Sequence, residues 1–516
     1  MKKLIKVCGL TIPLLTLICY SCGDRFYDIA PPGDQLTDAN FFTSKSDAQA
    51  ALNGVYDGIQ KDAIYRGSAL SKIEYFPTGD AVPNAGEPDD FDFYKLEWER
   101  NWFRLENVWR ALYTMINRAN VTIANVEAMD NSLIDAEAKD QIVAQAKYLR
   151  AIMYFPLARL FGNIPLVVDP PSLDGVILPE GSPVADVWAQ IIQDLQEAAP
   201  LLPLSWDDTN TGRATRSAAL AMLSKISLYA NDYNGAVTYA EQVIALGEDA
   251  LLPEYRSVFA DNNENNAEMI FSTQNRVIPG GGWRDDNEGV IAITQSELPG
   301  NIPSEVSTAF GGWGGYSPSM DLINTMETND QDSIIDERLR GQFLLHNMKH
   351  PDLDFVFDTA VHSTNTGVAF TKYWHQPNPA VDPQYSGTDR PIIRYAEVLL
   401  DYAEALNEVG RTSDALAALN QVRNRAGLPD FTSASSEEIL NQIFRDRRIE
   451  TYWEHNFFSE INRRGLFLDW VRENRSDIDD LDLNKPFFQQ QPIRMPIPIT
   501  ELEVNPNLTQ NPGYDF

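Results

Sequence analysis

Helical periodicity dominates the first half of the chain. Between residues 108 and 129, apolar side chains recur at intervals of three or four, at Leu112, Met115, Ile116, Ala119, Ile123 and Val126. This spacing places them on one face of an amphipathic helix. Residues 135–161 continue the pattern up to Gly162-Asn163, a pair that favours a helix end. Residues 184–202 form a further predicted helix, which two prolines close.

Two later segments, residues 219–246 and 395–424, share an internal pattern. In each, a turn sequence separates two small residues that stand twelve positions apart: Ser224 with Ala236, and Ala403 with Ala415. Small side chains at this offset allow two antiparallel helices to approach closely, as in a tetratricopeptide helix pair. The alternative is two unrelated helical hairpins. A helical-repeat scaffold usually offers a binding or assembly surface rather than a catalytic pocket.

Residues 253–390 have a different composition. They are rich in glycine, asparagine and proline and contain only short β-prone runs, at 267–273 and 290–294. We expect an irregular, loop-rich excursion here, where function most often resides. The flanking parts, residues 39–252 and 391–516, carry the helical pattern and are expected to form one composite domain, with a Pro-rich tail packed against the helices.

The first 21 residues have the features of a secretory leader. Three lysines precede an apolar run from Leu10 to Ile18, which is too short to cross a bilayer of about 30 Å as a helix. The small residue Ser21 stands just before Cys22, as cleavage by a lipoprotein signal peptidase requires. We therefore expect residues 1–21 to be removed and Cys22 to carry a lipid that anchors the protein to a membrane, with residues 22–38 as a tether. The alternative is an ordinary signal peptide that contains a cysteine by chance.

Composition and charge exclude several classes of function. The 516 residues are 43% hydrophobic and 22% charged, an ordinary globular balance, but the formal net charge is -33. Such an acidic surface repels phosphate backbones, so nucleic-acid binding is not expected. The three cysteines all lie within the first 22 residues. That excludes a disulfide scaffold, a thiolate zinc site, an iron–sulfur cluster and a thiol nucleophile in the rest of the chain, and we expect no cofactor.

Ordered sequence blocks run through most of the chain. They are Leu-Arg-Ala followed by Phe-Gly-x-x-Pro-Leu within residues 148–166, the helix entry at 213–220, the segments 393–405 and 419–427, and the closing Pro-Ile-Pro, Asn-Pro-Asn-Leu and Gln-Asn-Pro-Gly-Tyr. With these blocks the sequence strongly resembles the SusD/RagB family, surface-exposed lipoproteins of Bacteroidetes. One segment departs from the family pattern: Glu-Arg-Arg-x-Glu-Leu followed by Glu-Gly becomes Asp446-Arg-Arg-Ile-Glu-Thr followed by Glu454-His455.

The resemblance implies a mainly α fold, a tetratricopeptide-like scaffold of about four helix pairs with a ligand-binding excursion. It implies a non-catalytic lipoprotein at the cell surface of the outer membrane, which captures oligosaccharides. It also implies a partner, a SusC-like TonB-dependent transporter, over which the lipoprotein sits as a hinged lid. The alternatives are a peptide-binding RagB-like lipoprotein and a surface glycoside hydrolase on a helical fold.

Aromatic residues in the excursion are the first candidates for ligand binding. Trp283 with Arg284, and Trp313 with Tyr316, are flanked by glycines in segments of low periodicity. A flat aromatic ring can stack on the apolar face of a sugar, and a neighbouring polar group can meet the hydroxyls. The alternative is that these rings plug the scaffold from an irregular loop.

An earlier loop, from Tyr75 to Tyr94, resembles the family's other ligand-contributing region. Within it, Tyr75 and Phe93 are aromatic candidates, and Asp80 is the first polar candidate. Three tryptophans that follow are interpreted differently, because spacings of four and seven indicate one helical stripe that serves core packing: Trp98, Trp102 and Trp109.

Other chemistry has weak support in the sequence. His346 and His350 stand four positions apart, a spacing that suits a metal on a helix, but no clear third ligand is nearby. The acidic run 261–266 lacks the spacing of a recognised calcium loop, so a solvated turn is favoured. We expect no metal site and no catalytic residue.

Overall fold

The computed structural model describes residues 41–514 except 62, 66–68, 84–87, 171–177, 261, 276–314, 329–333, 352–353, 363 and 374–387. The helices are α2 (Lys45–Ile59), α3 (Ala69–Tyr75), α4 (Pro88–Tyr94), α5 (Phe103–Ala128), α6 (Ala136–Phe161), α7 (Val184–Ala198), α8 (Arg216–Tyr229), α9 (Tyr233–Leu246), α11 (Met320–Asn324), α12 (Arg338–Gln342), α13 (Tyr395–Glu408), α14 (Thr412–Arg425), α15 (Ser436–Glu450), α16 (Phe457–Arg463), α17 (Phe467–Asn474) and α18 (Ile499–Val504), with 3-10 turns η2 (Tyr255–Phe259) and η3 (Pro486–Gln489). The strands are β1 (Ala81–Pro83), β2 (Phe271–Ser272), β3 (Tyr316–Pro318), β4 (Phe343–Leu344), β5 (Ala369–Phe370) and β6 (Pro391–Ile393). The predicted mainly α fold is confirmed.

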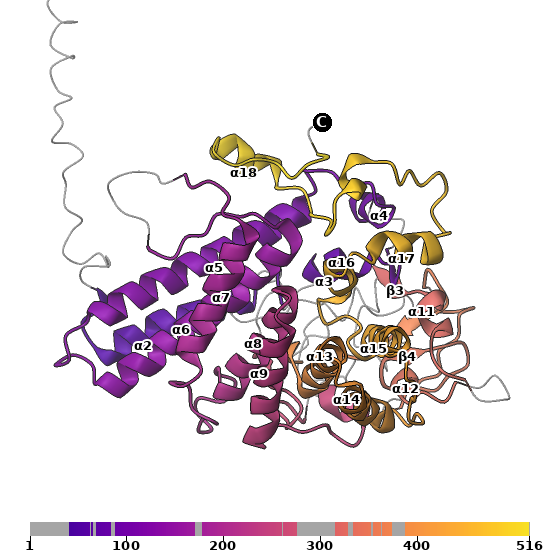
Figure 1. Ribbon diagram of the computed structural model, residues 1–516, viewed down its shortest axis with the longest axis horizontal. Helices are drawn as coiled ribbons and strands as arrows, with labels where there is room; N and C mark the ends of the chain where they lie inside the picture. Colours follow the sequence, from indigo (N-terminus) through magenta and orange to yellow (C-terminus); the bar gives the residue numbers. More distant parts are fainter. Residues whose placement is uncertain are drawn as a thin grey trace, which may run out of the picture.

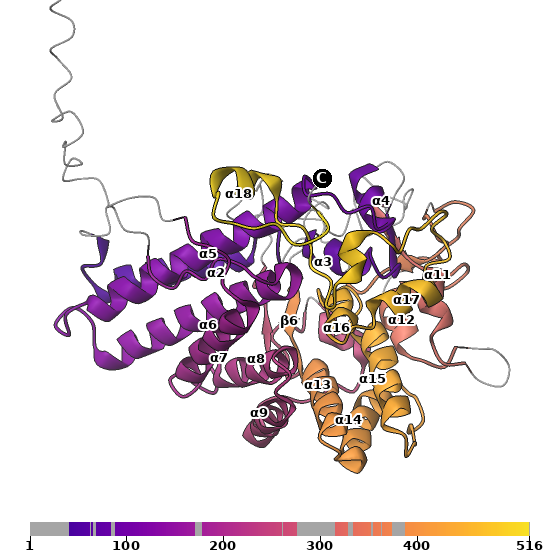
Figure 2. The same cartoon turned by 45° about the horizontal axis from the view of Figure 1, so that its top comes forward.

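Successive helices pack against their neighbours and form an arc. The helix α6 lies between α5 and α7, the pair α8–α9 follows, and α9 packs on α13, which opens the pair α13–α14. Figures 1 and 2 show α2, α5, α6 and α7 on one side of the molecule and α13, α14 and α15 on the other, with α8 and α9 between them. This order is that of a stacked helical-repeat scaffold.

The long helices begin and end where local sequence favours it. The side chain of Asp135 caps α6 by accepting a hydrogen bond from the backbone N–H of Ala138. The helix ends at Gly162, whose φ of +76° suits glycine. In α5, the predicted apolar stripe from Leu112 to Val126 is buried in the core. The helix α7 ends at Ala198, slightly before the predicted boundary at 202.

The two predicted helical hairpins are present as α8–α9 and α13–α14. In the first, the hydroxyl of Ser224 donates a hydrogen bond to the carbonyl oxygen of Ala236 at 2.9 Å, which requires the close approach that small residues permit. In the second, Ala403 and Ala415 are fully buried. The two hairpins also pack on each other through α9 and α13, so they are parts of one scaffold.

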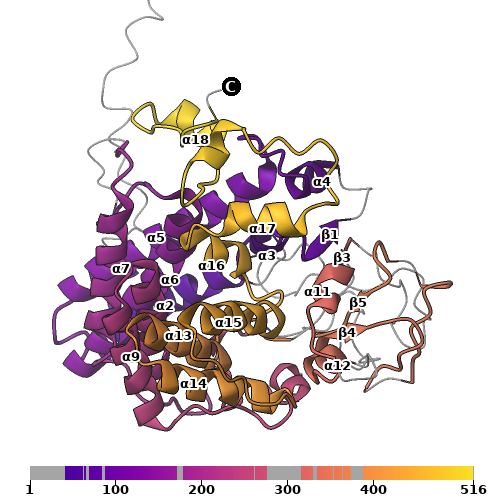
Figure 3. The ribbon, with the colours of Figure 1, turned by 45° about the vertical axis from the view of Figure 1, so that its right-hand side comes forward.

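Short strands attach the excursion to the helical body. The described strands form three two-stranded antiparallel sheets: β1 with β3, β2 with β6, and β4 with β5. The elements α11, α12, β3, β4 and β5 lie together beside α15, on the side of the molecule that Figure 3 brings forward. We call this part, with β1, the loop-rich side.

The Pro-rich tail returns to the helices, as predicted. The backbone N–H of Met495 donates to the carbonyl oxygen of Leu160, and the side-chain amide of Asn511 donates to that of Phe161. The tail therefore covers the C-terminal end of α6. Within the described ranges, no helix combines the length and the apolar character that crossing a membrane requires.

Candidate functional site

The two segments that the sequence singled out meet in one small sheet. Strand β1 pairs with β3 in the register Ala81 with Pro318 and Pro83 with Tyr316. The segment from Tyr75 to Tyr94, which contains β1 and α4 and is not a single loop as expected, is therefore a neighbour of the end of the glycine-rich segment. Nothing in the sequence had indicated this pairing.

Four predicted site residues lie outside the described residues. They are Cys22, Trp283, Arg284 and Trp313. The lipid anchor at Cys22 and the ligand contacts of the other three therefore stay predictions.

Two of the predicted aromatic contacts are core residues in the structure. Tyr316 has 1% of its surface exposed and stacks on Trp453 with the ring centroids 4.2 Å apart. Tyr75 is fully buried, stacks on the same indole, and its hydroxyl donates to the carbonyl oxygen of Thr451 at 2.6 Å. The expectation that these rings form an exposed platform is corrected, because neither has a free face for a ligand.

Phe93 also belongs to the core. Its ring stacks on Trp102 at a centroid distance of 3.8 Å and on Trp98 at 5.7 Å. Both tryptophans are buried, as is Trp109, which confirms the packing interpretation for all three. They do not share one helix, however, because α5 begins at Phe103, so that Trp98 and Trp102 precede it and only Trp109 lies within it.

Asp80 is a buried ion-pair partner and not a surface ligand contact. Its carboxylate accepts hydrogen bonds from Arg448, at 2.9 Å from Nε and 2.5 Å from Nη2. Arg448 in turn reaches Asp321 at 2.8 Å. Burial raises the pKa of Asp80, and Arg448 opposes that rise. The pair joins β1 to α15, so the predicted ligand role of Asp80 is corrected to a structural one.

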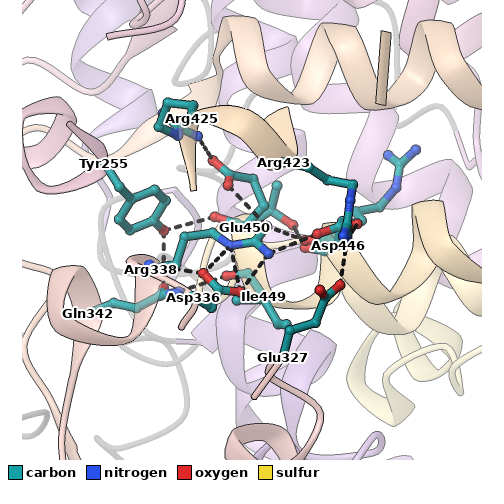
Figure 4. Close-up of polar contacts among 12 residues, drawn as sticks. Tyr255, Glu327, Asp336, Arg338, Gln342, Arg423, Arg425, Asp446, Ile449 and Glu450 are labelled. Atoms are coloured by element: carbon teal, nitrogen blue, oxygen red, sulfur yellow. Dashed lines mark hydrogen bonds and ion pairs between the residues drawn. The ribbon is translucent and has the colours of Figure 1, made fainter. Parts of the chain in front are cut away.

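A buried charge cluster lies beneath the loop-rich side. We define the Glu450 network as nine charged residues: Glu268, Asp336, Arg338, Arg394, Arg423, Arg425, Asp446, Glu450 and Glu454. At its centre, Glu450 pairs with Arg394 at 2.7 Å. It also pairs with Arg338, at 3.4 Å, and with Arg425 (Figure 4). Although burial alone would raise its pKa, these guanidinium groups hold the pKa of Glu450 well below the ordinary value.

The Glu450 network fixes the loop-rich side on the helices. Arg338, at the start of α12, bridges Asp336 and Asp446 at 2.7 and 2.8 Å, and Asp446 belongs to α15 (Figure 4). Arg394, just before α13, contacts both Glu268 and Glu454 at 2.7 Å. The sequence departs from the family pattern in the charged segment 446–454. This segment therefore supplies carboxylates whose ion pairs hold the loop-rich side on the helices.

A polar cleft of about 350 Å³ opens between α2, the loop 207–213 and residue 274. Besides the carboxylate of Asp57 and two threonine hydroxyls, its lining includes amides, a phenol and a guanidinium, groups that can meet sugar hydroxyls: Asn53, Tyr56, Gln60, Asn210, Arg213 and Gln274. The Arg213 guanidinium lies 5.2 Å from the ring centre of Tyr56. Sequence reasoning missed this cleft because its parts come from three distant segments without a common motif.

The two histidines with metal-compatible spacing do not lie on one helix. Residues 346 and 350 follow β4 in a turn rather than sharing a helix, and His350 is buried whereas His346 is exposed. The residues that the structure describes contain no group of three or more His, Cys, Asp or Glu that could hold a metal ion.

Two family models match the chain. One, described as "Starch-binding associating with outer membrane", covers residues 25–228, and the other, described as the SusD family, covers residues 358–514.

Similar proteins align over nearly the whole chain. SusD-like protein P25 of Formosa agariphila is 24% identical over 97% of this chain and 98% of its own length. The crystal structure of a SusD superfamily protein from Bacteroides vulgatus superposes with a TM-score of 0.77 at 22% identity, over 92% of this chain and 100% of that one. A laminarin-binding SusD-like protein superposes with a TM-score of 0.74 at 23% identity, with the same coverage.

Proposed function

Because the chain belongs to the SusD/RagB family, we propose that it captures oligosaccharides at the cell surface and passes them to a SusC-like TonB-dependent transporter. The protein is a non-catalytic binding protein and not an enzyme. The observation that carries the proposal is the match of residues 25–228 to the starch-binding, outer-membrane family model. The laminarin-binding protein of the same fold adds support for a glucan as the ligand class.

We place the capture surface on the loop-rich side. Strand pairing between β1 and β3 brings together the two segments that the sequence favoured, and the Glu450 network provides a rigid base beneath them. In this proposal Trp283 and Trp313 stack on sugar rings and Arg284 meets hydroxyls. The buried residues Tyr75, Asp80, Phe93 and Tyr316 support the surface from below.

The direct test is isothermal titration of the protein with laminarin and starch oligosaccharides. We expect measurable binding, and a loss of about 1–3 kcal/mol of binding free energy in Trp283→Ala and in Trp313→Ala, the usual value of an aromatic contact. Phe103→Ala is the control, since Phe103 is an exposed aromatic residue at the start of α5. Unchanged affinity in both tryptophan variants would move the site elsewhere.

Two outcomes would replace the proposal. Binding of peptides without any response to glycans would favour the peptide-capturing alternative. Release of reducing sugar, abolished by replacing one carboxylate, would favour the glycoside hydrolase.

The proposed surface location depends on lipid at Cys22. In cells, Cys22→Ala should move the protein from the membrane fraction to the soluble fraction, because no other segment of the sequence is apolar enough to anchor it. Retention of the variant in membranes would contradict lipid anchoring at this position.

A further inference from the structure

A second cavity, of about 310 Å³, lies in the helical body where four helices and the tail meet. It is bounded by the C-terminal ends of α6 and α8, the N-terminal end of α7, helix α16 and the tail around residue 494. We call it the Arg494 pocket. Its lining includes three guanidinium groups and two aromatic rings: Arg159, Arg463, Arg494, Trp188 and Tyr229. It is separate from the loop-rich side, where α11, α12 and β1 lie.

Among the residues that the structure describes, Arg494 has no carboxylate partner. Its Nη1 donates to the carbonyl oxygens of Ala158 and Arg159, at 3.3 and 3.0 Å, in the last turn of α6. These carbonyls and the helix dipole favour a cation at this end. Nε and Nη2 of Arg494 have no hydrogen-bond acceptor in the described part of the chain, and no carboxylate there lies within 4.0 Å. Two donors of this side chain are therefore available to a ligand.

The charge of Arg494 is poorly compensated by its surroundings. Burial lowers its pKa to about 10, with no acidic neighbour to oppose the shift. The other two arginines of the pocket differ, since Arg159 pairs with Glu74 at 3.2 Å, and Arg463 pairs with Glu460 at 2.8 Å. The buried Nε of Arg159 nevertheless has no hydrogen-bond partner. The pocket thus holds one unneutralised cation and a further unsatisfied guanidinium donor.

Two aromatic side chains in the lining of the Arg494 pocket favour a ligand that has an apolar surface as well as a negative charge. Trp188 and Tyr229 lie with ring centroids 5.8 Å apart and an angle of 50° between their planes, and they are 7% and 8% exposed. Phe155 packs against both rings and the Arg463 guanidinium lies over Tyr229, so only the small exposed parts of the two rings can contact the carbon atoms of a sugar. The volume is at the lower end of ligand pockets and suits a single sugar unit.

We propose that the Arg494 pocket binds the carboxylate of a uronic acid unit, with Nε and Nη2 of Arg494 as a two-point hydrogen-bond donor and the sugar ring against Trp188 and Tyr229. A planar guanidinium matches the two oxygens of a carboxylate, which makes arginine the preferred partner for such a group. In a chain of net charge -33, the long-range field repels anions, so a carboxylate is held only where a local cation lacks its own partner.

The test is isothermal titration of the protein with sodium D-glucuronate at low ionic strength. We expect binding that weakens at least about tenfold in Arg494→Gln, since hydrogen bonds to a charged group are lost. Arg411→Gln is the matched control, because Arg411 is an exposed arginine already paired with Glu241 and Asp414. Its affinity should equal that of the wild type. Added salt should weaken binding through screening.

A second variant and a second ligand complete the test. Arg494→Lys keeps the charge but loses the planar fork, so we expect an affinity between those of the wild type and Arg494→Gln, and this variant serves if the glutamine variant does not fold. Equal affinity for glucuronate in the wild type and both Arg494 variants would overturn the proposal. Binding of sodium sulfate without binding of glucuronate would also overturn it, because the sugar ring would then play no part. Failure of glucan capture at the loop-rich side leaves this result unaffected.

Discussion

The Glu450 network buries its arginines, whereas Arg494 in the pocket is partly exposed, and the charges of the two regions have different partners. In the network, each arginine faces at least one carboxylate, and Glu450 alone receives three of them. In the pocket, the hydrogen-bond acceptors of Arg494 within the described ranges are the carbonyl oxygens at the end of α6. The two regions are otherwise comparable, since both join helices to irregular segments.

The difference separates a scaffold from a place that can accept a ligand. Taking an ion out of water costs several kcal/mol, and this cost is offset only when the partner charges are well placed. The network meets most of that condition internally, although the buried Nε of Arg425 also lacks a hydrogen-bond partner. The pocket leaves one charge and several donors incompletely satisfied, and this is the condition in which a ligand carboxylate adds stability.

Removing the central carboxylate should have the largest effect. Glu450→Gln leaves Arg338, Arg394 and Arg425 with too few partners in a buried site. We expect the free energy of unfolding to fall by about 3–5 kcal/mol, the usual loss when one member of a buried ion pair is removed. Urea unfolding followed by circular dichroism measures this change.

The matched control on the same helix is Glu437→Gln. Glu437 is exposed in the first turn of α15, where its replacement loses only a helix-dipole interaction of about 0.3–1 kcal/mol. If Glu450→Gln and the control destabilise the protein equally, the network is not what holds the loop-rich side on α15.

Acid should weaken the junction between the two regions through His455. This residue follows Glu454 of the network, and its carbonyl oxygen accepts a hydrogen bond from Arg159 of the pocket. Its ring is buried, with Nδ1 2.7 Å from the hydroxyl of Ser71 and Nε2 3.1 Å from the carbonyl oxygen of Tyr65. Burial, reinforced by the charge of Arg159, lowers the pKa of His455 to about 3.

The sign of the pH effect follows from this shift. Because the unfolded chain takes up the proton near the ordinary histidine pKa, the contribution of neutral His455 is complete above about pH 6.5. It is lost as the pH falls from there toward 3, at about 1.4 kcal/mol per pH unit. His455→Asn removes the titrating ring and keeps a residue that tolerates the positive φ of this position. Unfolding curves between pH 7 and 5 should show a shallower pH slope for the variant, and parallel slopes would contradict the assignment.

Local patterns allowed much of the helical scaffold to be predicted. The hairpin α8–α9 follows from Ser224 and Ala236, because helix contacts at this offset depend on residues close in the sequence. The end of α6 follows from Gly162 for the same reason. Such elements are determined by periodicity and by the conformational preferences of single residues.

The site residues could not be predicted in this way, because burial depends on distant partners. Asp80 stands in a Gly-Asp-Ala sequence typical of an exposed turn, but its partner Arg448 lies 368 residues away. Tyr316 follows glycines, yet strand pairing turns its ring toward Trp453. In the Arg494 pocket, the notable feature is that no carboxylate of the described residues pairs with Arg494. No sequence pattern indicates which charges remain without a partner in the folded chain.

Among the variants within the two regions, Arg494→Gln has the smallest expected effect on stability, and it completes the comparison. No carboxylate of the described chain loses its partner in this variant, so only hydrogen bonds to the last carbonyls of α6 are weakened. We expect a loss of about 1 kcal/mol in the free energy of unfolding. Arg394→Met in the network is the counterpart, since it leaves Glu268, Glu450 and Glu454 short of a partner and should cost about 3–5 kcal/mol. Urea unfolding of both variants measures the two changes in the free energy of unfolding. Similar losses in the two variants would mean that Arg494 is as important to the scaffold as Arg394. In that case Arg494 would have no charge to offer a ligand.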